Sequence, residues 1–377
     1  MELYICIYGL LFLSAFGELF SRSNTNSRHI MLLWCVFFTF FGGLRWDIGG
    51  DFMSSVELFE RAEWSNIFNF DRYGNGEETL EPGYVFLNVV SKSLGGYFPL
   101  FDLFMCAFLQ YSIYKFCVRL SPQYPLLAYC MVISLGFRYI FPVRSMVAFS
   151  FIFWAYIYFM ERNLKKYLLV VFCACSIHYM TLVAIPLYWF PKIKFKVKFW
   201  HGLILFTMMP LLGYKFRNII LLLAIYLEGD IGDKVNRYAG IDKDPSSAGA
   251  SLLLGILLNL FFLAIYVNMR KKRQFYNEAI FNSLLLCYLM VISISSVFSQ
   301  GMQEFVRIIG VFVPAQIVLF MMGYSYMQTT RYRTYASLFF VVYYIYRINK
   351  TLNSVLYIEE IVPYRNIFDV NIPIFDI

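Results

Sequence analysis

The sequence has little charge and few histidines, and it lacks the short motifs of several enzyme classes. Only 15% of its 377 residues are charged and three are histidine, whereas 60% are hydrophobic. A soluble globular protein has about 25% charged residues. The motifs HExxH, GxSxG, GxGxxG and the P-loop are absent, so zinc or serine hydrolysis, ATP hydrolysis and dinucleotide binding have no support. The composition favours a membrane protein.

The cysteines and basic residues also lack the spacing of ligand-binding motifs. All eight cysteines lie in apolar stretches without a CxxC pair or a Cys/His metal spacing, so no metal or other cofactor is predicted. Whether a divalent ion takes part is left open. The net charge of +8 comes from short basic clusters between apolar runs, such as 162–166 and 270–273. This pattern orients membrane proteins, so no nucleic-acid partner is expected.

Repeated apolar segments predict an all-α fold, a polytopic transmembrane helical bundle of about 10–12 spans that forms a single integral membrane domain over residues 1–377. About 20 apolar residues cross the hydrocarbon core of a bilayer. The segment 167–190 either crosses once or dips in and returns. The other predicted spans are 2–20, 30–44, 98–114, 124–137, 143–160, 200–213, 251–269, 278–298, 308–326 and 335–352.

Two longer polar connections interrupt the predicted spans. The first, 45–97, is predicted to be an outer loop that contains an amphipathic surface helix over 82–96. The second, 228–250, is predicted to be another outer loop. If the N-terminus is outside, the short inner loops hold most of the basic clusters, as membrane topology requires. Both polar loops then face the periplasm or the cell exterior.

A polar cluster, RWDIGGD (45–51), directly follows the second span. Gly49 permits a tight turn, and Asp47 and Asp51 stand four residues apart across it. Two interpretations remain open. The two carboxylates face one pocket, or Asp51 caps a helix over 52–60 while Arg45 pairs with Asp47.

Further polar residues occur at other predicted outer boundaries. Arg138 and Arg144 lie in a short outer connection, and Arg307 begins a later span. Guanidinium groups bind phosphate oxygens in a bidentate manner, so these arginines are candidate diphosphate ligands. His178 interrupts an apolar segment. It is either a hydrogen-bonded core residue or a residue that lines a cavity.

In this order, the polar residues resemble the EpsG-like branch of the Wzy-type O-antigen polymerases. Two departures from the family pattern are Ser145, where glutamine usually follows the arginine, and the loop 228–250, which has no counterpart. The positions that carry the resemblance are Arg45 with Gly49-Gly50-Asp51, Glu81-Pro82-Gly83-Tyr84, Arg144-Ser145-Met146, His178, Arg307 and Pro363-Tyr364.

The resemblance implies a GT-C-like integral membrane glycosyltransferase in the bacterial inner (cytoplasmic) membrane, with its active site facing the periplasm. Such an enzyme polymerises undecaprenyl-diphosphate-linked oligosaccharide repeat units into O-antigen, capsule or exopolysaccharide. Its expected partners are the lipid-linked donor, the lipid-linked acceptor and membrane lipid, and a chain-length regulator is left open. No nucleotide is needed, because the diphosphate bond carries the activation.

Within this expectation the candidate residues take three roles. Arg144 and Arg307 are predicted to bind the diphosphate, with Arg138 or Arg45 assisting. Asp51 is the preferred base for the acceptor hydroxyl over His178, while Asp47 holds the loop through Arg45. The predicted sugar- and acceptor-binding residues are Trp46, Glu81, Tyr84 and Tyr364.

Three other interpretations compete. A transporter or flippase of lipid-linked oligosaccharide would need a polar pathway open to both sides, whereas the predicted charged cluster lies on one side. An O-antigen ligase or other polysaccharide-modifying transferase would be expected to carry more histidines, or one in a large outer loop. A non-enzymatic subunit would leave the outer arginines unexplained.

Overall fold

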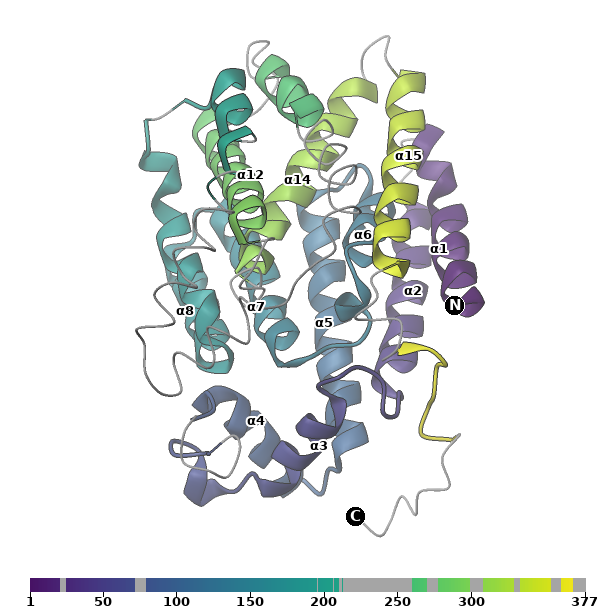
Figure 1. Ribbon diagram of the computed structural model, residues 1–377, viewed down its shortest axis with the longest axis vertical. Helices are drawn as coiled ribbons and strands as arrows, with labels where there is room; N and C mark the ends of the chain where they lie inside the picture. The colour runs from purple at the N-terminus through teal and green to yellow at the C-terminus, as the bar shows by residue number, and fades with distance from the viewer. Residues whose placement is uncertain are drawn as a thin grey trace. The chain divides into compact units, whose positions relative to one another are not determined.

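A computed structural model of the chain consists of helices and connecting turns (Figure 1). No strand occurs in the part of the chain that it describes, apart from two isolated bridges, Arg45 with Asn366 and Asp71 with Thr79. The predicted all-α helical membrane bundle is confirmed. The described residues are 1–20, 25–71, 79–194, 196–205, 207–209, 212, 260–269, 277–298, 308–328, 333–353 and 361–368.

The chain divides into two compact units, which are described separately. The first unit is Met1–Leu182 together with Gln328–Ile377, and the second is Val183–Met327. The predicted single integral domain stays a prediction. The first unit contains α1 (Glu2–Phe20), α2 (Thr25–Gly43), α3 (Phe52–Arg61), η1 (Trp64–Asn66), α4 (Pro82–Ser93), α5 (Phe98–Leu120), α6 (Pro125–Ile133), η2 (Phe137–Tyr139), α7 (Arg144–Met160), α8 (Leu164–Ile177) and α15 (Arg333–Leu352).

The second unit also follows the predicted spans. Its described helices are α12 (Glu278–Phe298), α14 (Ile309–Gln328, whose last residue belongs to the first unit) and the helical residues Phe199–Met209 and Leu260–Met269. The 3₁₀ segment η3 (Tyr179–Lys192) begins in the first unit and continues into the second. Among the described helices, Glu2–Leu19, Phe98–Leu120 and Ile309–Met327 are long and apolar enough to cross a membrane.

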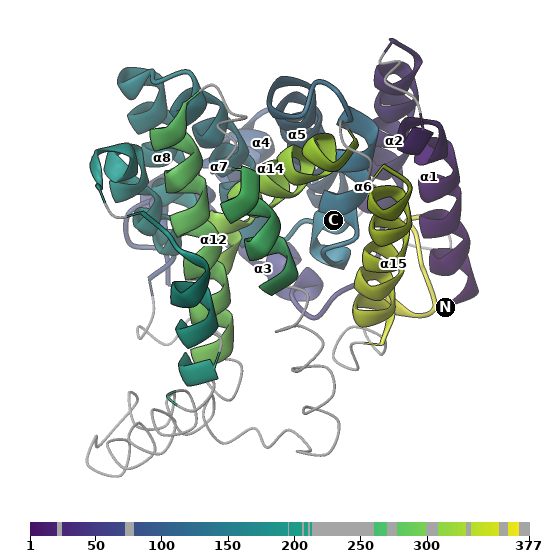
Figure 2. The ribbon, with the colours of Figure 1, turned by 90° about the horizontal axis from the view of Figure 1, so that it is seen from above.

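Within the first unit, α5 packs against α2, α6 and α7, and α7 packs against α8 (Figures 1 and 2). The C-terminal helix α15 lies beside α1, where the Tyr344 hydroxyl donates to the Tyr8 carbonyl oxygen at 3.1 Å. Helices α3 and α4 lie at one end of the long helices of this unit (Figure 1). The first unit thus places α3 and α4, the helices of the predicted outer loop, at one end of its own bundle.

The predicted surface helix over 82–96 is α4, and its sequence explains both its start and its burial. Pro82 occupies the first helical turn, where its missing N–H removes no intrahelical bond. The helix buries one face, with Tyr84, Val85 and Val89 in a core shared with α3 and α7. This apolar face therefore packs against the protein. The second outer loop, 228–250, lies outside the described residues.

The ambiguous segment 167–190 is broken at His178. Helix α8 ends at Ile177, His178 is extended (φ −154°, ψ 112°), and η3 follows with Pro186 and Pro191 inside it. Each proline lacks the N–H that donates a helical backbone hydrogen bond, so the second half leaves two such bonds unmade. Whether the segment crosses or returns stays a prediction.

Glu18 is a buried acid near the end of α1, and its carboxylate accepts hydrogen bonds from the backbone N–H groups of Leu126 (3.3 Å) and Leu127 (2.8 Å). These are unpaired donors at the start of α6, where a negative charge is also favoured. We expect Glu18→Ala to lower the free energy of unfolding by about 2–4 kcal/mol, because two buried donors lose their acceptor.

A thiol-reactive dye can measure this loss on heating, since most of the described cysteines are buried. Glu18→Gln keeps one acceptor oxygen and should lose less. Glu161→Gln is the control, because Glu161 forms a largely exposed pair with Arg119 and should change stability by less than about 1 kcal/mol. An unchanged melting temperature for Glu18→Ala would show that α6 does not depend on this cap.

Candidate active site

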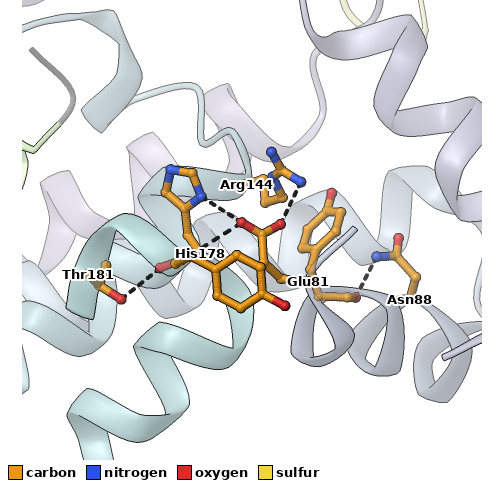
Figure 3. A network of polar contacts seen from close by, with 7 residues as sticks. Glu81, Asn88, Arg144, His178 and Thr181 are labelled. Atoms are coloured by element: carbon orange, nitrogen blue, oxygen red, sulfur yellow. Dashed lines mark hydrogen bonds and ion pairs between the residues drawn. The ribbon is translucent and has the colours of Figure 1, made fainter. Parts of the chain in front are cut away.

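Glu81 joins two other candidate side chains in one buried network (Figure 3). Its Oε2 accepts from Arg144 at 2.7 Å, and its Oε1 lies 3.0 Å from His178 Nδ1. The backbone N–H of Tyr179 also donates to Oε1, at 3.3 Å. One carboxylate thus holds a guanidinium group and an imidazole side by side.

Three helix termini meet at this network. Glu81 is the residue before α4, Arg144 is the first residue of α7, and His178 directly follows α8. The Glu81 side chain does not cap its own helix. It points instead toward the other two termini (Figure 3), so the network ties α4 to both α7 and α8.

Gly83 is required for this close approach of α4 to α8. A Cβ built on Gly83 would clash with the Ser176 hydroxyl and would lie 2.7 Å from the Ser176 backbone oxygen. Real Cβ atoms do not approach backbone oxygen this closely. The glycine of the Glu-Pro-Gly-Tyr sequence therefore lets Glu81 reach His178.

The charges of the network favour an ionised Glu81. Burial by itself raises the pKa of this carboxyl, but the hydrogen bond with His178 and the charge of Arg144 outweigh burial and hold the pKa below its ordinary value. Glu81 is therefore a carboxylate at neutral pH. A carboxylate can only accept, so the hydrogen bond runs from His178 Nδ1–H to Glu81 Oε1.

His178 is 6% exposed, and its Nε2 atom is buried without a hydrogen-bond partner in the described part of the chain. Its backbone oxygen accepts from the Thr181 hydroxyl at 2.8 Å, which fixes the residue at the helix end. A buried imidazole nitrogen without a partner is costly unless a ligand satisfies it. In the described part of the chain, His178 Nε2 is thus the ring atom that is left for a bound group to satisfy.

A second ion pair lies next to the network. Arg45 Nε is 3.2 Å from Asp102 Oδ2, and another Arg45 nitrogen donates to the Pro142 carbonyl oxygen at 2.8 Å. The Arg45 guanidinium also lies over the rings of Phe52 (5.5 Å) and Phe141 (5.6 Å). Arg45 is 4% exposed and held by these contacts, although its Nε makes no hydrogen bond in the described residues.

A narrow cavity lies between the Arg45–Asp102 pair and Arg144. Its volume of about 10 Å³ is roughly the space that one water molecule needs. Its polar lining comes from Arg45, Ser55, Tyr84, Asp102 and Arg144. Burial raises the pKa of Tyr84 to about 12, so its hydroxyl stays protonated.

The two acids of the RWDIGGD stretch lie away from this cavity. The predicted Arg45–Asp47 pair is wrong, because Arg45 turns inward to Asp102 while the exposed Asp47 lies 3.7 Å from Arg365. The tight turn is present, with Gly49 at φ +93°, a value that favours glycine. Asp51 occupies the N-cap position of α3 but is exposed, and its side chain makes no capping hydrogen bond.

The remaining candidates are distributed around the first unit. Trp46 is half-buried against the core of α3 and α4. Tyr364 stacks on Phe41 with a centroid distance of 4.3 Å and donates to its carbonyl oxygen at 2.8 Å, which anchors the C-terminal segment. Arg138 lies in η2 over the Tyr139 ring. Arg307 lies outside the described residues.

A sequence model of the EpsG family matches residues 28–366, which is nearly the whole chain. The chain belongs to the EpsG family. No curated protein and no solved structure matches it. Membership supports a general polysaccharide polymerase-like role at a membrane, in agreement with the helical bundle.

Sequence reasoning on this EpsG-family chain missed Asp102, which pairs with Arg45. The signal was present, because Asp102 is an acid inside the otherwise apolar segment 98–114, and such acids are costly unless paired. It singled out Tyr364 in the C-terminal segment but not the contact of that segment with Trp46, whose N–H donates to the Arg365 carbonyl oxygen at 3.1 Å. In the part of the chain that is described, no group of three or more His, Cys, Asp or Glu residues could hold a metal ion.

The need for glycine at position 83 gives a test of the α4–α8 contact. We expect Gly83→Ala to cost about 1–3 kcal/mol of stability through overpacking. It should also lower polysaccharide production by at least tenfold, because Glu81 moves away from His178. Melting temperature and polymer made by cells carrying only the variant are the two measurements.

Gly9→Ala is the matched control for this substitution. Gly9 lies inside α1, and a Cβ there meets no atom within 4 Å. Alanine at position 9 should leave polymer production unchanged. Equal polymer production by Gly83→Ala and Gly9→Ala would mean that the contact at Gly83 does not position the network.

Proposed function

We propose that this EpsG-family protein is a glycosyltransferase of the bacterial inner membrane that polymerises undecaprenyl-diphosphate-linked oligosaccharide repeat units on the periplasmic face. The observation that carries the proposal is the pairing of Arg144 and His178 through one carboxylate. Such a transfer needs a cation beside the departing diphosphate and a base beside the acceptor hydroxyl. Both groups lie at the same carboxylate, Glu81.

In the proposed reaction, His178 Nε2 takes the proton of the acceptor hydroxyl. The hydroxyl oxygen forms a bond to the anomeric carbon of the donor sugar, while the bond from that carbon to the diphosphate oxygen breaks. The diphosphate leaves with the electron pair of the broken bond. Glu81 stabilises the imidazolium that results, because it already accepts from the other ring nitrogen.

Arg144 is proposed to stabilise the charge that develops on the departing diphosphate. It is partly exposed, with 18% of its side chain accessible, so a ligand can reach it. A fixed cation next to developing charge acts without reorganisation, and such electrostatic effects are usually the largest catalytic contribution. Glu81 holds the guanidinium in position before substrate arrives.

This assignment gives Asp51 and Arg45 other roles. His178 replaces Asp51 as the proposed base, because Asp51 is exposed on a turn, whereas His178 is held beside Arg144 by Glu81. Arg45 is proposed as a positioning residue that holds the connection at Pro142, two residues before Arg144. Arg307 stays a proposed diphosphate ligand on sequence grounds alone.

The test is reconstitution of purified protein in liposomes with lipid-linked repeat units from its own host and no nucleotide. We expect a ladder of products on a gel, spaced by one repeat unit. Products of a single length would contradict a polymerase and point to transfer onto another acceptor. Lipid-linked units that move between leaflets without growing would support a flippase.

A further inference from the structure

Two arginines, Arg138 and Arg347, lie at the turn between α6 and α7, apart from the Glu81 network. Arg138 lies in η2, and its guanidinium carbon is 5.6 Å from the centre of the Tyr139 ring. Arg347 reaches the same turn from α15, where it donates to the Leu135 carbonyl oxygen at 3.5 Å. The Thr351 hydroxyl donates to the Ser134 carbonyl oxygen at 3.0 Å and fixes α15 against this turn.

The charges of these two arginines act on one hydroxyl group. Burial raises the pKa of Tyr139, and the charges of Arg138 and Arg347 both oppose the rise. Neither arginine forms an ion pair with an acid in the described part of the chain. Arg45, Arg119 and Arg144 each have a carboxylate partner there.

The unpaired charge is accompanied by an unsatisfied donor. Arg347 Nε is buried and has no hydrogen-bond partner in the described residues, although its side chain is only half-buried overall. Leaving a charged donor without a partner is costly, and two cations at one turn repel each other. An anionic ligand that carries several oxygens would remove both costs.

The proposed reaction supplies such a ligand. Its acceptor keeps its own lipid diphosphate while its far sugar reacts, so two diphosphates must be bound at once, one at Arg144 and one elsewhere. We infer that Arg138 and Arg347 bind the diphosphate of the acceptor lipid, an inference that rests on the proposed function. The site then holds one end of the acceptor while its other end reaches His178.

The test compares two acceptors that carry the same oligosaccharide, one on undecaprenyl diphosphate and one on a neutral lipid. Each charge-assisted contact is worth about tenfold in affinity, so the wild-type protein should prefer the diphosphate acceptor by about a hundredfold in kcat/KM. The variant Arg138→Gln/Arg347→Gln should lose this preference and keep the wild-type rate on the neutral acceptor. Arg119→Gln removes a largely exposed arginine and should keep the preference.

Two outcomes would overturn the inference. The double variant keeps the preference, or it loses rate equally on both acceptors, as a purely structural defect would cause.

A bulk anionic lipid is a further source of phosphate. Assays in vesicles of phosphatidylcholine with and without phosphatidylglycerol distinguish it, because a defect that appears only with phosphatidylglycerol and on both acceptors would assign the site to that lipid.

A binding measurement separates this inference from the proposed function. Radiolabelled undecaprenyl diphosphate should bind the wild-type protein at two molecules per chain and the double variant at one. Suppose that the wild-type protein makes no ladder, while the double variant binds one molecule of undecaprenyl diphosphate fewer than the wild type. The polymerase proposal then fails and the anion site stands. Equal binding by both proteins overturns the anion site.

Discussion

Replacing Arg144 with alanine is expected to abolish the polysaccharide ladder and to lower the rate of polymerisation by about a thousandfold. Removing one preorganised donor from a site of developing negative charge costs about 10²–10³ in rate, and Arg144 also contributes a full charge. It lies 2.7 Å from Glu81, so its position is fixed before the substrate binds. The measurement is the initial rate of ladder formation in liposomes.

The Arg144 variants must be separated from unfolding, because the substitution leaves Glu81 with one fewer partner in a buried site. Arg144→Lys keeps a point charge but loses the bidentate geometry, so it should retain part of the activity and most of the stability. Arg119→Ala is the control for loss of one arginine at an exposed pair. Wild-type rates for a folded Arg144→Ala protein would remove Arg144 from the mechanism.

The helices of the fold were predictable because their apolar runs are long and their limits are marked by local chemistry. Prolines mark the starts of α4, α5 and α6, and α5, α7 and α15 begin within two residues of the predicted limits. The observed end of a helix differs from the predicted end where polar residues continue the helix. Helix α2 begins at Thr25 and not at residue 30, because its first turn is polar but still helical.

The members of the candidate site were predictable, but their pairing was not. The sequence Glu-Pro-Gly-Tyr, Arg144 and His178 were all singled out from the order of motifs. That Glu81 joins the other two depends on the contact of α4 with α8 at Gly83, which no local pattern encodes. Glu81 was accordingly expected to contact sugar, whereas the structure places it between a guanidinium group and an imidazole.

The error at Arg45 has the same cause. Asp47 is two residues away in sequence, but a backbone φ of +50° at Asp47 turns its side chain to the surface, where Arg365 lies. Asp102 is 57 positions later and becomes the partner because α2 and α5 pack side by side. Local spacing favoured Asp47 as the partner of Arg45, whereas in the fold Arg45 is buried next to Asp102.

Replacing His178 with asparagine is expected to lower the rate of polymerisation by about 10²–10⁴-fold while the protein stays folded. The side-chain amide of asparagine can still donate to Glu81 in place of Nδ1, but it cannot accept a proton as Nε2 does. General base catalysis commonly contributes a factor of this size. The rate is measured in liposomes, and folding is measured by the melting temperature.

Asp51→Asn decides between the two bases that the sequence left open. Asp51 is exposed and has no capping hydrogen bond, so its amide variant should keep the wild-type rate and stability. Thr181→Ala removes the hydrogen bond to the His178 backbone without altering the ring, and should lower activity less than His178→Asn. If His178→Asn keeps its rate while Asp51→Asn loses it, the base lies on the exposed turn, and the buried imidazole serves only to hold α8 against α4. The opposite result supports His178 as the base, because its Nε2 has no hydrogen-bond partner in the described residues and is left for the acceptor hydroxyl.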